Sequence, residues 1–402
     1  MKMVRECLPR DDDSPRLRGA GRVALLYGAQ FLAVGMAMPL LPVWLAALGL
    51  GSAAIGQVLA AQSFSRMLAQ PVIARVADRT GGLREVMLAC ALLALLVSTW
   101  LGSLARGFWP ILLGVAAAWF FFSPLIPLTE VLAVRVGERH GVAYGRMRLW
   151  GSLAFILGAM LAGLLLDALP AAMLIWAVVA AQFLTALGVL AQQRAEAGLS
   201  VADMPKNAAH EGNWKELLNA GFMLFLVVGG LVQASHAMLY GFAALHWRAL
   251  GYSGLTIGGL VTAGVLAEVA LFWFSGQLMR RVGAARLLML GAAMAALRWL
   301  GMAFDPPLPV LYGLQLLHAF TFGAAHLGAI AFIRTRAPAR LAATAQAIYS
   351  SISMGLFMML AMSASGQLYA AYGARAWLAM AGMAALAVPL AGLLRRVMPA
   401  RS

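Results

Sequence analysis

The stretch FFFSPLIPLTEVLAVRVGERHGVAYGRMRLWG, residues Phe120 to Gly151, joins two apolar runs through a short basic loop. It places Glu130 and Arg148 in or beside those runs, and their spacing suits facing residues on two antiparallel helices with a tight turn between them. An ionised group inside a bilayer costs roughly 2.5–3.5 kcal/mol on insertion scales, so it is rare unless it is paired or functional. Together with a few other buried charges, this pair favours a membrane carrier.

Long apolar runs recur through the rest of the chain. Of the 402 residues, 62% are hydrophobic and 11% are charged, which excludes a soluble enzyme. A helix needs about 20 apolar residues to cross a bilayer, and the runs are continuous rather than alternating, which favours helices over a barrel. We expect twelve spans, at about 22–47, 52–77, 85–104, 109–134, 146–169, 171–192, 219–246, 254–279, 285–304, 308–333, 341–370 and 376–397.

The net charge of +15 is distributed unevenly along the chain. Of the 30 Lys and Arg residues, 25 fall in the two tails and in the connections that follow even-numbered spans. Short loops rich in Lys and Arg stay cytoplasmic. We therefore expect a multi-pass protein of a bacterial-type inner membrane with both termini in the cytoplasm and no nucleic-acid partner.

Neither a signal peptide nor a cofactor site is expected. The first twenty residues are polar, and no small-residue cleavage site precedes the first apolar run. Cys7 and Cys90 offer no framework for a disulfide or a metal. We also find no P-loop and no nucleophile with an adjacent base, so we expect no metal, no cofactor and no enzymatic activity.

The second half of the chain repeats the first at an offset of 202 positions. The matches are Leu48-Gly49 with Leu250-Gly251, Ile55-Gly56 with Ile257-Gly258, Arg79-Thr80-Gly81 with Arg281-Val282-Gly283, and Arg84 with Arg286. Residues 193–216 are the longest polar connection. The repeat predicts an all-α fold of two six-helix bundles, residues 1–192 and 217–402, joined by a cytoplasmic linker and related by a pseudo-two-fold axis.

Five charged residues lie in or at the border of the apolar runs: Glu130, Glu268, Arg66, Arg148 and Arg298. Three cations against two acids leave one positive charge in surplus. A substrate carboxylate would neutralise that surplus, because guanidinium binds carboxylate through two parallel hydrogen bonds.

The helix that carries Glu130 also carries Pro124 and Pro127, each of which removes a backbone donor. We expect the hydroxyl groups of Ser123 and Thr129 to pair with the freed carbonyls. Irregular backbone is tolerated at membrane depth where it is packed in protein or lines a cavity, so this break favours a binding site. The alternative is an ion pair that only ties two helices together.

Glu268 and a stripe of residues on the tenth span are candidates for proton transfer. Burial penalises the charged form of a lone carboxylate, which suits a group that carries a proton, although Glu268 could instead pair inertly with an arginine. His318, Phe322 and His326 are four apart, so they share one face of a helix. His318 and His236 could titrate near neutral pH or simply bond to neighbouring backbone.

Several blocks resemble one named family. FFSPLIPLTEVLA, YGRMRLWGSLAFILG, ASHAMLYGFAALHW and LQLLHAFTFGAAHLGAIAFI look like the 3-phenylpropionic acid transporter family, a branch of the major facilitator superfamily related to the lactose/proton symporters. We assign proton coupling to Glu268, with Arg298 or His318 nearby, and we expect Trp150, Phe155, His236 and Tyr240 to contact the substrate. The resemblance implies substrate contact by Glu130 and Arg148. It also implies cytoplasmic gate loops containing Asp78, Arg79, Gly81 and Arg84, and Arg281, Gly283 and Arg286.

The sequence departs from the lactose/proton symporters at the proton site. Thr321 stands where their glutamate follows the helix-10 histidine, and Glu268 lies about one turn from their helix-8 glutamate. We expect a monomeric carrier that imports a small organic solute with a proton, most simply an aromatic carboxylate such as 3-phenylpropionate. The alternatives are a proton-coupled sugar symporter and a proton-driven efflux transporter.

Overall fold

The computed structural model describes residues 14–192 and 214–397, and within these two ranges the regular structure is entirely helical. The first half holds α1 Ser14–Ala47, α2 Ser52–Thr80, α3 Leu83–Ser103, α4 Phe108–Phe122, α5 Leu125–His140, α6 Tyr144–Ala168, η2 Ala171–Met173 and α7 Leu174–Leu190. The second half holds η4 Trp214–Leu217, α9 Ala220–Ala234, α10 Ala237–Ala249, α11 Gly254–Trp273, α12 Ser275–Val282, α13 Ala284–Met302, α14 Leu308–Leu316, η5 Ala319–Ala324, α15 Ala325–Arg336, η6 Ala339–Leu341, α16 Ala342–Ser351, η7 Ile352–Leu356, α17 Phe357–Tyr372, η8 Gly373–Ala376 and α18 Trp377–Val397.

The helices follow the predicted spans, although several spans are interrupted. Within residues 14–192 and 214–397, ten ranges are long and apolar enough to cross a membrane. α2 is not among them, because polar and charged residues such as Arg66 interrupt its apolar sequence. The range Thr344–Val397 contains two predicted spans in one helical stretch of 54 residues. The count of twelve crossings therefore stays a prediction.

The sequence repeat has a counterpart in the backbone. Gly49 and Gly251 occupy matching positions, and both adopt positive φ, 83° and 84°. Gly81 and Gly283 also match, with φ of 67° and 78°. Residues other than glycine rarely adopt such angles. Gly81 and Gly283 nevertheless differ in conformation, because their ψ values are −2° and 159°.

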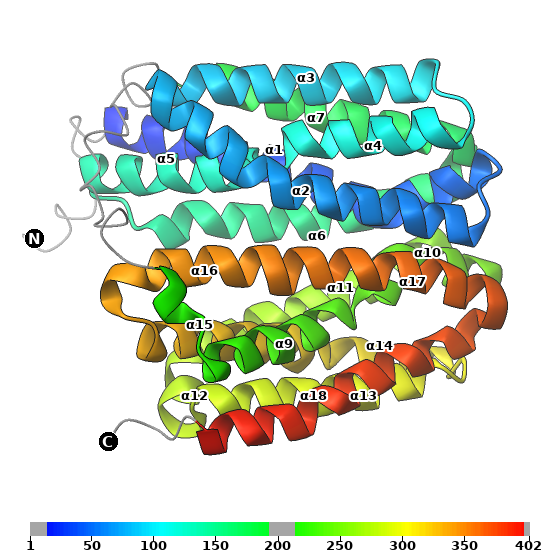
Figure 1. Cartoon of the computed structure of the whole chain (residues 1–402). Helices are drawn as coiled ribbons and strands as arrows, with labels where there is room; N and C mark the ends of the chain where they lie inside the picture. The colour runs from blue at the N-terminus through cyan, green and yellow to red at the C-terminus, as the bar shows by residue number, and fades with distance from the viewer. Residues whose placement is uncertain (1–13, 193–213, 398–402) are drawn as a thin grey trace, which may run out of the picture.

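The helices of each half pack chiefly against one another, and the halves meet along a few helix pairs (Figure 1). α2 crosses α17, α6 crosses α11, and α1 lies against α10. α1 begins and α18 ends at the same end of the molecule, which we call the terminal end. The connections α2–α3 and α12–α13, which carry the repeated arginines, lie at that end too.

The halves approach most closely at the opposite end, which we call the far end. A Cβ on Gly56 of α2 would lie 2.7 Å from the Cα atom of Gly366 of α17. Cβ atoms on Gly163 of α6 and Gly254 of α11 would each clash with the other's carbonyl oxygen. Two helix crossings at the far end are therefore possible only because these positions lack side chains.

Polar contacts also join the halves at the far end. The carboxylate oxygens of Asp167, at the end of α6, accept hydrogen bonds from the backbone N–H of Gly254 at 2.9 and 2.8 Å. Arg248 donates to the carbonyl oxygen of Leu166 across 2.7 Å. A carboxylate at the first turn of a helix is favoured by the helix dipole, so Asp167 stabilises the start of α11 from the other half.

Part of the predicted organisation lies outside the described residues. The predicted linker, residues 193–216, is described only from Trp214 onward. The predicted charges of the first thirteen residues, and Arg194, Lys206 and Arg401, also lie outside the described residues.

Candidate functional site

In the first half, Arg148 of α6 lies against two aromatic rings of α1. Its guanidinium carbon is 4.2 Å from the ring centre of Phe31 and 5.7 Å from that of Tyr27. Both Arg148 and Glu130 belong to the described part of the chain, yet no salt bridge joins them there. The predicted direct pairing is therefore replaced by a cation–π contact, while the two charges still act on each other at longer range.

The helix that carries Glu130 is broken, as its prolines predict. α4 ends at Phe122 and α5 begins at Leu125. The Thr129 hydroxyl donates to the carbonyl of Leu125 at 2.8 Å, not to the carbonyls that the prolines leave free. Among the described residues, the Ser123 hydroxyl has no hydrogen-bond partner, so the prediction that it pairs with a freed carbonyl was wrong.

In the second half, Arg298 of α13 is the centre of a buried polar network. Its guanidinium donates to Nδ1 of His318 at 3.0 Å, to Oγ1 of Thr321 at 3.1 Å and to Oε1 of Gln315 at 2.6 Å. The guanidinium carbon also lies 4.6 Å from the ring centre of Trp299. Arg298 is 1% exposed, and these contacts replace the water that a buried charge loses.

The bond from Arg298 decides the protonation pattern of His318. Arginine can only donate, so Nδ1 of His318 accepts, and the proton of the neutral ring is on Nε2. Nε2 lies 3.5 Å from a carboxylate oxygen of Glu268, which comes from α11. With Nδ1 occupied by the Arg298 N–H and Nε2 already protonated, His318 has no lone pair for a further proton, so the carboxylate of Glu268 is the group of this pair that can bind one.

A second histidine, His236, belongs to the same network and directly precedes α10. Nδ1 of His236 lies 3.1 Å from the carbonyl of Val232, which only accepts, so this nitrogen carries the ring proton. Nε2 then accepts from the hydroxyl of Thr321 across 3.1 Å. Thr321 thus accepts from Arg298 and donates to His236, so the three groups form one directed chain.

The predicted stripe on the tenth span is confirmed. The ring of His318 stacks on Phe322 at 5.4 Å, and Phe322 stacks on His326 at 6.0 Å. The helix is a π-helix across η5, between His318 and α15. Such bulges are frequent at functional sites, and nothing in the sequence indicated this one.

Arg148 and Glu268 belong to helices of different halves that pack against each other. The charges of Arg148 and Glu268 act on each other across the contact between α6 and α11. Tyr240 of α10 lies within electrostatic reach of Glu268 and Arg66. Arg66 is exposed although it lies in the middle of α2. The predicted intramembrane charges therefore converge from several helices.

Two predicted aromatic residues of α6 differ in placement. Trp150 is 57% exposed, and it shares its helix face with Leu157 and Leu164, seven and fourteen residues further on, which are 54% and 50% exposed. This face points away from Arg148, so we withdraw Trp150 from the site. Phe155 is seven residues from Arg148 on the same face, and its backbone packs against Gly35 of α1.

The predicted gate loops lie at the terminal end. Asp78 and Arg79 are exposed, and Gly81 ends α2 in the left-handed conformation. Arg84 donates to the carbonyls of Gln192 and Leu190, at 2.8 and 2.9 Å, and so ties α3 to the end of α7 within the first half. Arg281, Gly283 and Arg286 are exposed or partly exposed in the second half.

Sequence reasoning missed four residues of the site: Tyr27, Phe31, Gln30 and Gln315. Gln30 and Gln315 are 0% and 1% exposed. The signal that could have found them is a glutamine inside an apolar run, because a buried amide needs partners. Tyr27 and Phe31 gave no such signal among the many aromatic residues of the chain.

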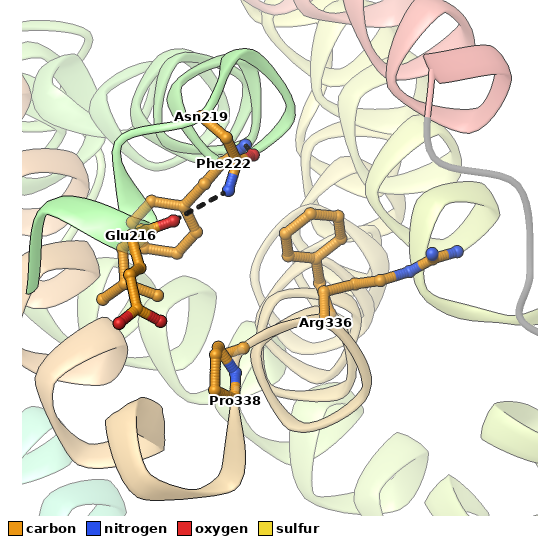
Figure 2. A pocket seen from close by; sticks show the side chains of 8 residues that line it. Glu216, Asn219, Phe222, Arg336 and Pro338 are labelled. Carbon is orange, nitrogen blue, oxygen red and sulfur yellow. Dashed lines mark hydrogen bonds between the residues drawn. The ribbon is translucent and has the colours of Figure 1, made fainter. Parts of the chain in front are cut away.

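One cavity lies away from these charges. It has a volume of about 140 Å³ at the terminal end, between the start of α9 and the end of α15. Figure 2 shows Glu216, Phe222 and Pro338 around it. Arg340 forms an ion pair with Glu216 at its edge. Across residues 14–192 and 214–397, no group of three potential metal ligands occurs.

The broken helices and buried charges define a membrane transporter, and comparison with known proteins identifies its family. Residues 22–379 match the MFS_1 like family, and the chain belongs to it. The chain is 32% identical to the "Probable 3-phenylpropionic acid transporter" of Escherichia coli (strain K12) over 94% of its length and 97% of that protein. It is 31% identical to the maltose permease of Geobacillus stearothermophilus over 83% of each chain. The predicted family resemblance is thus confirmed.

Solved structures agree on the fold. The nucleoside transporter NupG superposes with a TM-score of 0.78 at 17% identity, covering 95% of this chain and 99% of that one. A bacterial homologue of the human lysosomal transporter Spinster, inward-facing and unoccupied, gives a TM-score of 0.74 at 14% identity, covering 95% and 97%. These homologues and neighbours are transporters, not enzymes.

Proposed function

We propose that this protein is a proton-coupled symporter that imports a small aromatic carboxylate, such as 3-phenylpropionate, by alternating access. The observation that carries the proposal is the 3.5 Å approach of His318 to Glu268, whose helix α11 packs against α6, the helix of Arg148, across the two halves. A cation able to hold a carboxylate there lies within electrostatic reach of a carboxylate able to bind a proton.

The proposal includes twelve crossings with both termini in the cytoplasm. At 1.5 Å per residue, a 54-residue helix would be about 80 Å long, far more than the roughly 30 Å of a bilayer core. Gly373 interrupts the range Thr344–Val397 with a φ of 55°, which supports two crossings there. The 29 residues of α2 are also long enough to cross. The arginines at the terminal end support its cytoplasmic placement.

Substrate contact is assigned to Arg148 and the groups around it. Its guanidinium rests on Phe31 and keeps its planar hydrogen-bonding edge for a carboxylate. The rings of Phe31 and Tyr27 would also lie beside an aromatic substrate. The charge of Glu130, on α5, attracts Arg148 at long range, and no salt bridge to Glu130 blocks the guanidinium.

Proton binding is assigned to Glu268, with the Nε2–H of His318 beside it. Glu268 is 18% exposed at its side chain, and its carboxylate faces the proton-bearing nitrogen of His318. Protonation of Glu268 would remove its attraction for Arg148, so proton binding and the charge available for substrate are linked. A substrate carboxylate and the proton of Glu268 would then enter together.

Alternating access requires that the two ends open in turn. The halves are closed at the far end by two glycine crossings and by Asp167. In the proposed topology this arrangement is closed toward the outside.

Sugar symport is the second candidate, because the relatives include a maltose permease and the raffinose permease of Escherichia coli, 25% identical over 90% of this chain. A cluster with two carboxylates and a glutamine could also bind hydroxyl groups. The candidates differ in whether the transported solute carries a negative charge.

Uptake into proteoliposomes tests the proposal. Radiolabelled 3-phenylpropionate should accumulate when an inward proton gradient is imposed, and a protonophore should abolish the accumulation. Glu268→Gln should lose accumulation but keep exchange of labelled for unlabelled substrate, since exchange moves no net proton. The matched control is Glu138→Gln, at a position near the end of α5. Full gradient-driven accumulation by Glu268→Gln would refute the proton assignment, and uptake of maltose without 3-phenylpropionate would favour the sugar symporter.

A further inference from the structure

Gln30 of α1 donates hydrogen bonds to the first turn of α5. The residue is 0% exposed. Its side-chain nitrogen Nε2 lies 2.8 Å from Oγ1 of Thr129 and 3.3 Å from the carbonyl oxygen of Leu125. Thr129 immediately precedes Glu130, so the contact acts directly on the backbone that carries this carboxylate.

The direction of these hydrogen bonds fixes the orientation of the amide. The carbonyl of Leu125 can only accept, and the Thr129 hydroxyl donates its proton to it. Oγ1 of Thr129 therefore accepts from Gln30, and the NH₂ group of Gln30 faces α5. Within the described residues, Oε1 of Gln30 has no partner. A methionine would fill the same space without this cost, so the amide is not explained by stability.

The helix that Gln30 holds is weakly connected to the one before it. Pro124 and Pro127 lack the N–H groups that would bond to the carbonyls of Phe120 and Ser123. α4 and α5 are separate helices for this reason. The orientation of α5 therefore depends on side-chain contacts such as the one from Gln30.

The same face of α1 also contacts Arg148. Phe31, next to Gln30, lies under the guanidinium, and Tyr27 is one turn away. One helix thus contacts Arg148 and also Thr129, the residue before Glu130, although Glu130 and Arg148 form no salt bridge with each other. We propose that Gln30 is a positioning residue that, through Thr129, sets where Glu130 stands relative to Arg148. Its consequence for transport rests on the substrate role proposed above for those two residues.

A chemical probe of position 130 tests the placement without using transport. Glu130→Cys is prepared in a protein whose Cys7 and Cys90 are replaced by serine, and its rate of alkylation by N-ethylmaleimide is measured. Adding Gln30→Met should change that rate severalfold, because α5 is released. Gln182→Met is the matched control, since Gln182 is also buried and has an unpaired Oε1 but lies on α7. Equal alkylation rates in all three proteins would overturn the proposal.

Transport kinetics provide the second readout. Gln30→Met and Thr129→Val should each raise the KM for 3-phenylpropionate about tenfold, while the melting temperature of Gln30→Met stays at or above the parent value. The double variant should be no worse than either single one, because both remove the same contact. Thr129→Ser keeps the hydroxyl and should restore KM. Additive effects, or failure of Thr129→Ser to rescue, would refute action through Thr129.

The two experiments separate this proposal from the proposed function. If Gln30→Met changes the alkylation rate of the thiol at position 130 while replacement of Glu130 leaves uptake intact, the positioning role stands and the substrate role of Glu130 falls. If Gln30→Met does not fold, Thr129→Val removes the same acceptor without altering α1 and answers the same question.

Discussion

Arg298 donates a hydrogen bond to Nδ1 of His318 across 3.0 Å, and this bond turns the proton-bearing Nε2 of the ring toward Glu268. His318 therefore has two separable roles, as an acceptor for a buried cation and as a partner for a carboxylate. Asparagine reproduces an acceptor near the Nδ1 position, whereas leucine reproduces neither nitrogen.

We expect His318→Asn to keep the melting temperature of the purified protein and to lose proton-driven accumulation. His318→Leu should lose both, because an N–H of Arg298 is left buried without an acceptor, at a cost of about 1–3 kcal/mol. Thermal unfolding in detergent and uptake in proteoliposomes measure the two effects. Equal melting temperatures for the two variants would contradict the acceptor role.

Thr321 bridges Arg298 and His236 by accepting from one and donating to the other. Thr321→Val keeps the shape but leaves Nε2 of His236 without a donor, so we expect a loss of about 1–3 kcal/mol in the free energy of unfolding. Thr321→Ser keeps the hydroxyl and should unfold like the parent. If valine is tolerated as well as serine, the directed chain is wrong.

The sequence predicted much of the fold because two signals, the length of the apolar runs and the position of glycines, can be read from short stretches of sequence. Apolar length places the helices to within a few residues, and the paired glycines Gly49 and Gly251 place the repeat. The break at Pro124 was predictable, because proline removes a donor wherever it stands. The interruption between α9 and α10 at Ser235 and the π-helix of η5 carry no proline, so no comparable sequence signal marks them. The Trp299 indole donates to Ser235 at 2.9 Å.

The candidate site was predicted less completely, because it depends on helix rotation. The charges stand out in apolar runs, so Glu130, Arg148, Glu268 and Arg298 were found. Their partners did not follow from spacing. Arg148 meets Phe31 rather than Glu130, because α6 packs against α1. Trp150 was expected to contact the substrate, but it lies on the exposed face of α6 opposite Arg148.

The contact between Arg148 and Phe31 predicts how substitutions at these two positions change the affinity for substrate. Phe31→Tyr should preserve substrate affinity, whereas Phe31→Leu should lose the cation–π contribution of about 0.5–2 kcal/mol. Arg148→Lys should weaken binding further, because lysine cannot present two parallel N–H groups to a carboxylate. Binding of 3-phenylpropionate by calorimetry gives all three affinities. Unchanged affinity in Arg148→Lys would exclude a bidentate contact.

The far-end crossing predicts how the protein can be forced open. A side chain at Gly254 clashes with the carbonyl of Gly163, and separating these helices would also break the bonds from Gly254 to Asp167. We expect Gly254→Val to shift the population toward a state open at the far end, since a few kcal/mol suffice for such a shift. Ala159 is 0% exposed beneath this crossing, so Ala159→Cys, in the protein without Cys7 and Cys90, reports the opening through its alkylation rate.

In that background, alkylation at position 159 should be much faster with Gly254→Val than without it. Gly313→Val is the matched control, because a Cβ at Gly313 of α14 has no atom within 4 Å among its described neighbours. The control should leave the rate unchanged, since it adds the same side chain without a clash. Equal rates in the two variants would show that the glycine contact does not hold the far end closed. Acceleration by Gly254→Val alone would tie the conformation of the whole transporter to the absence of one side chain.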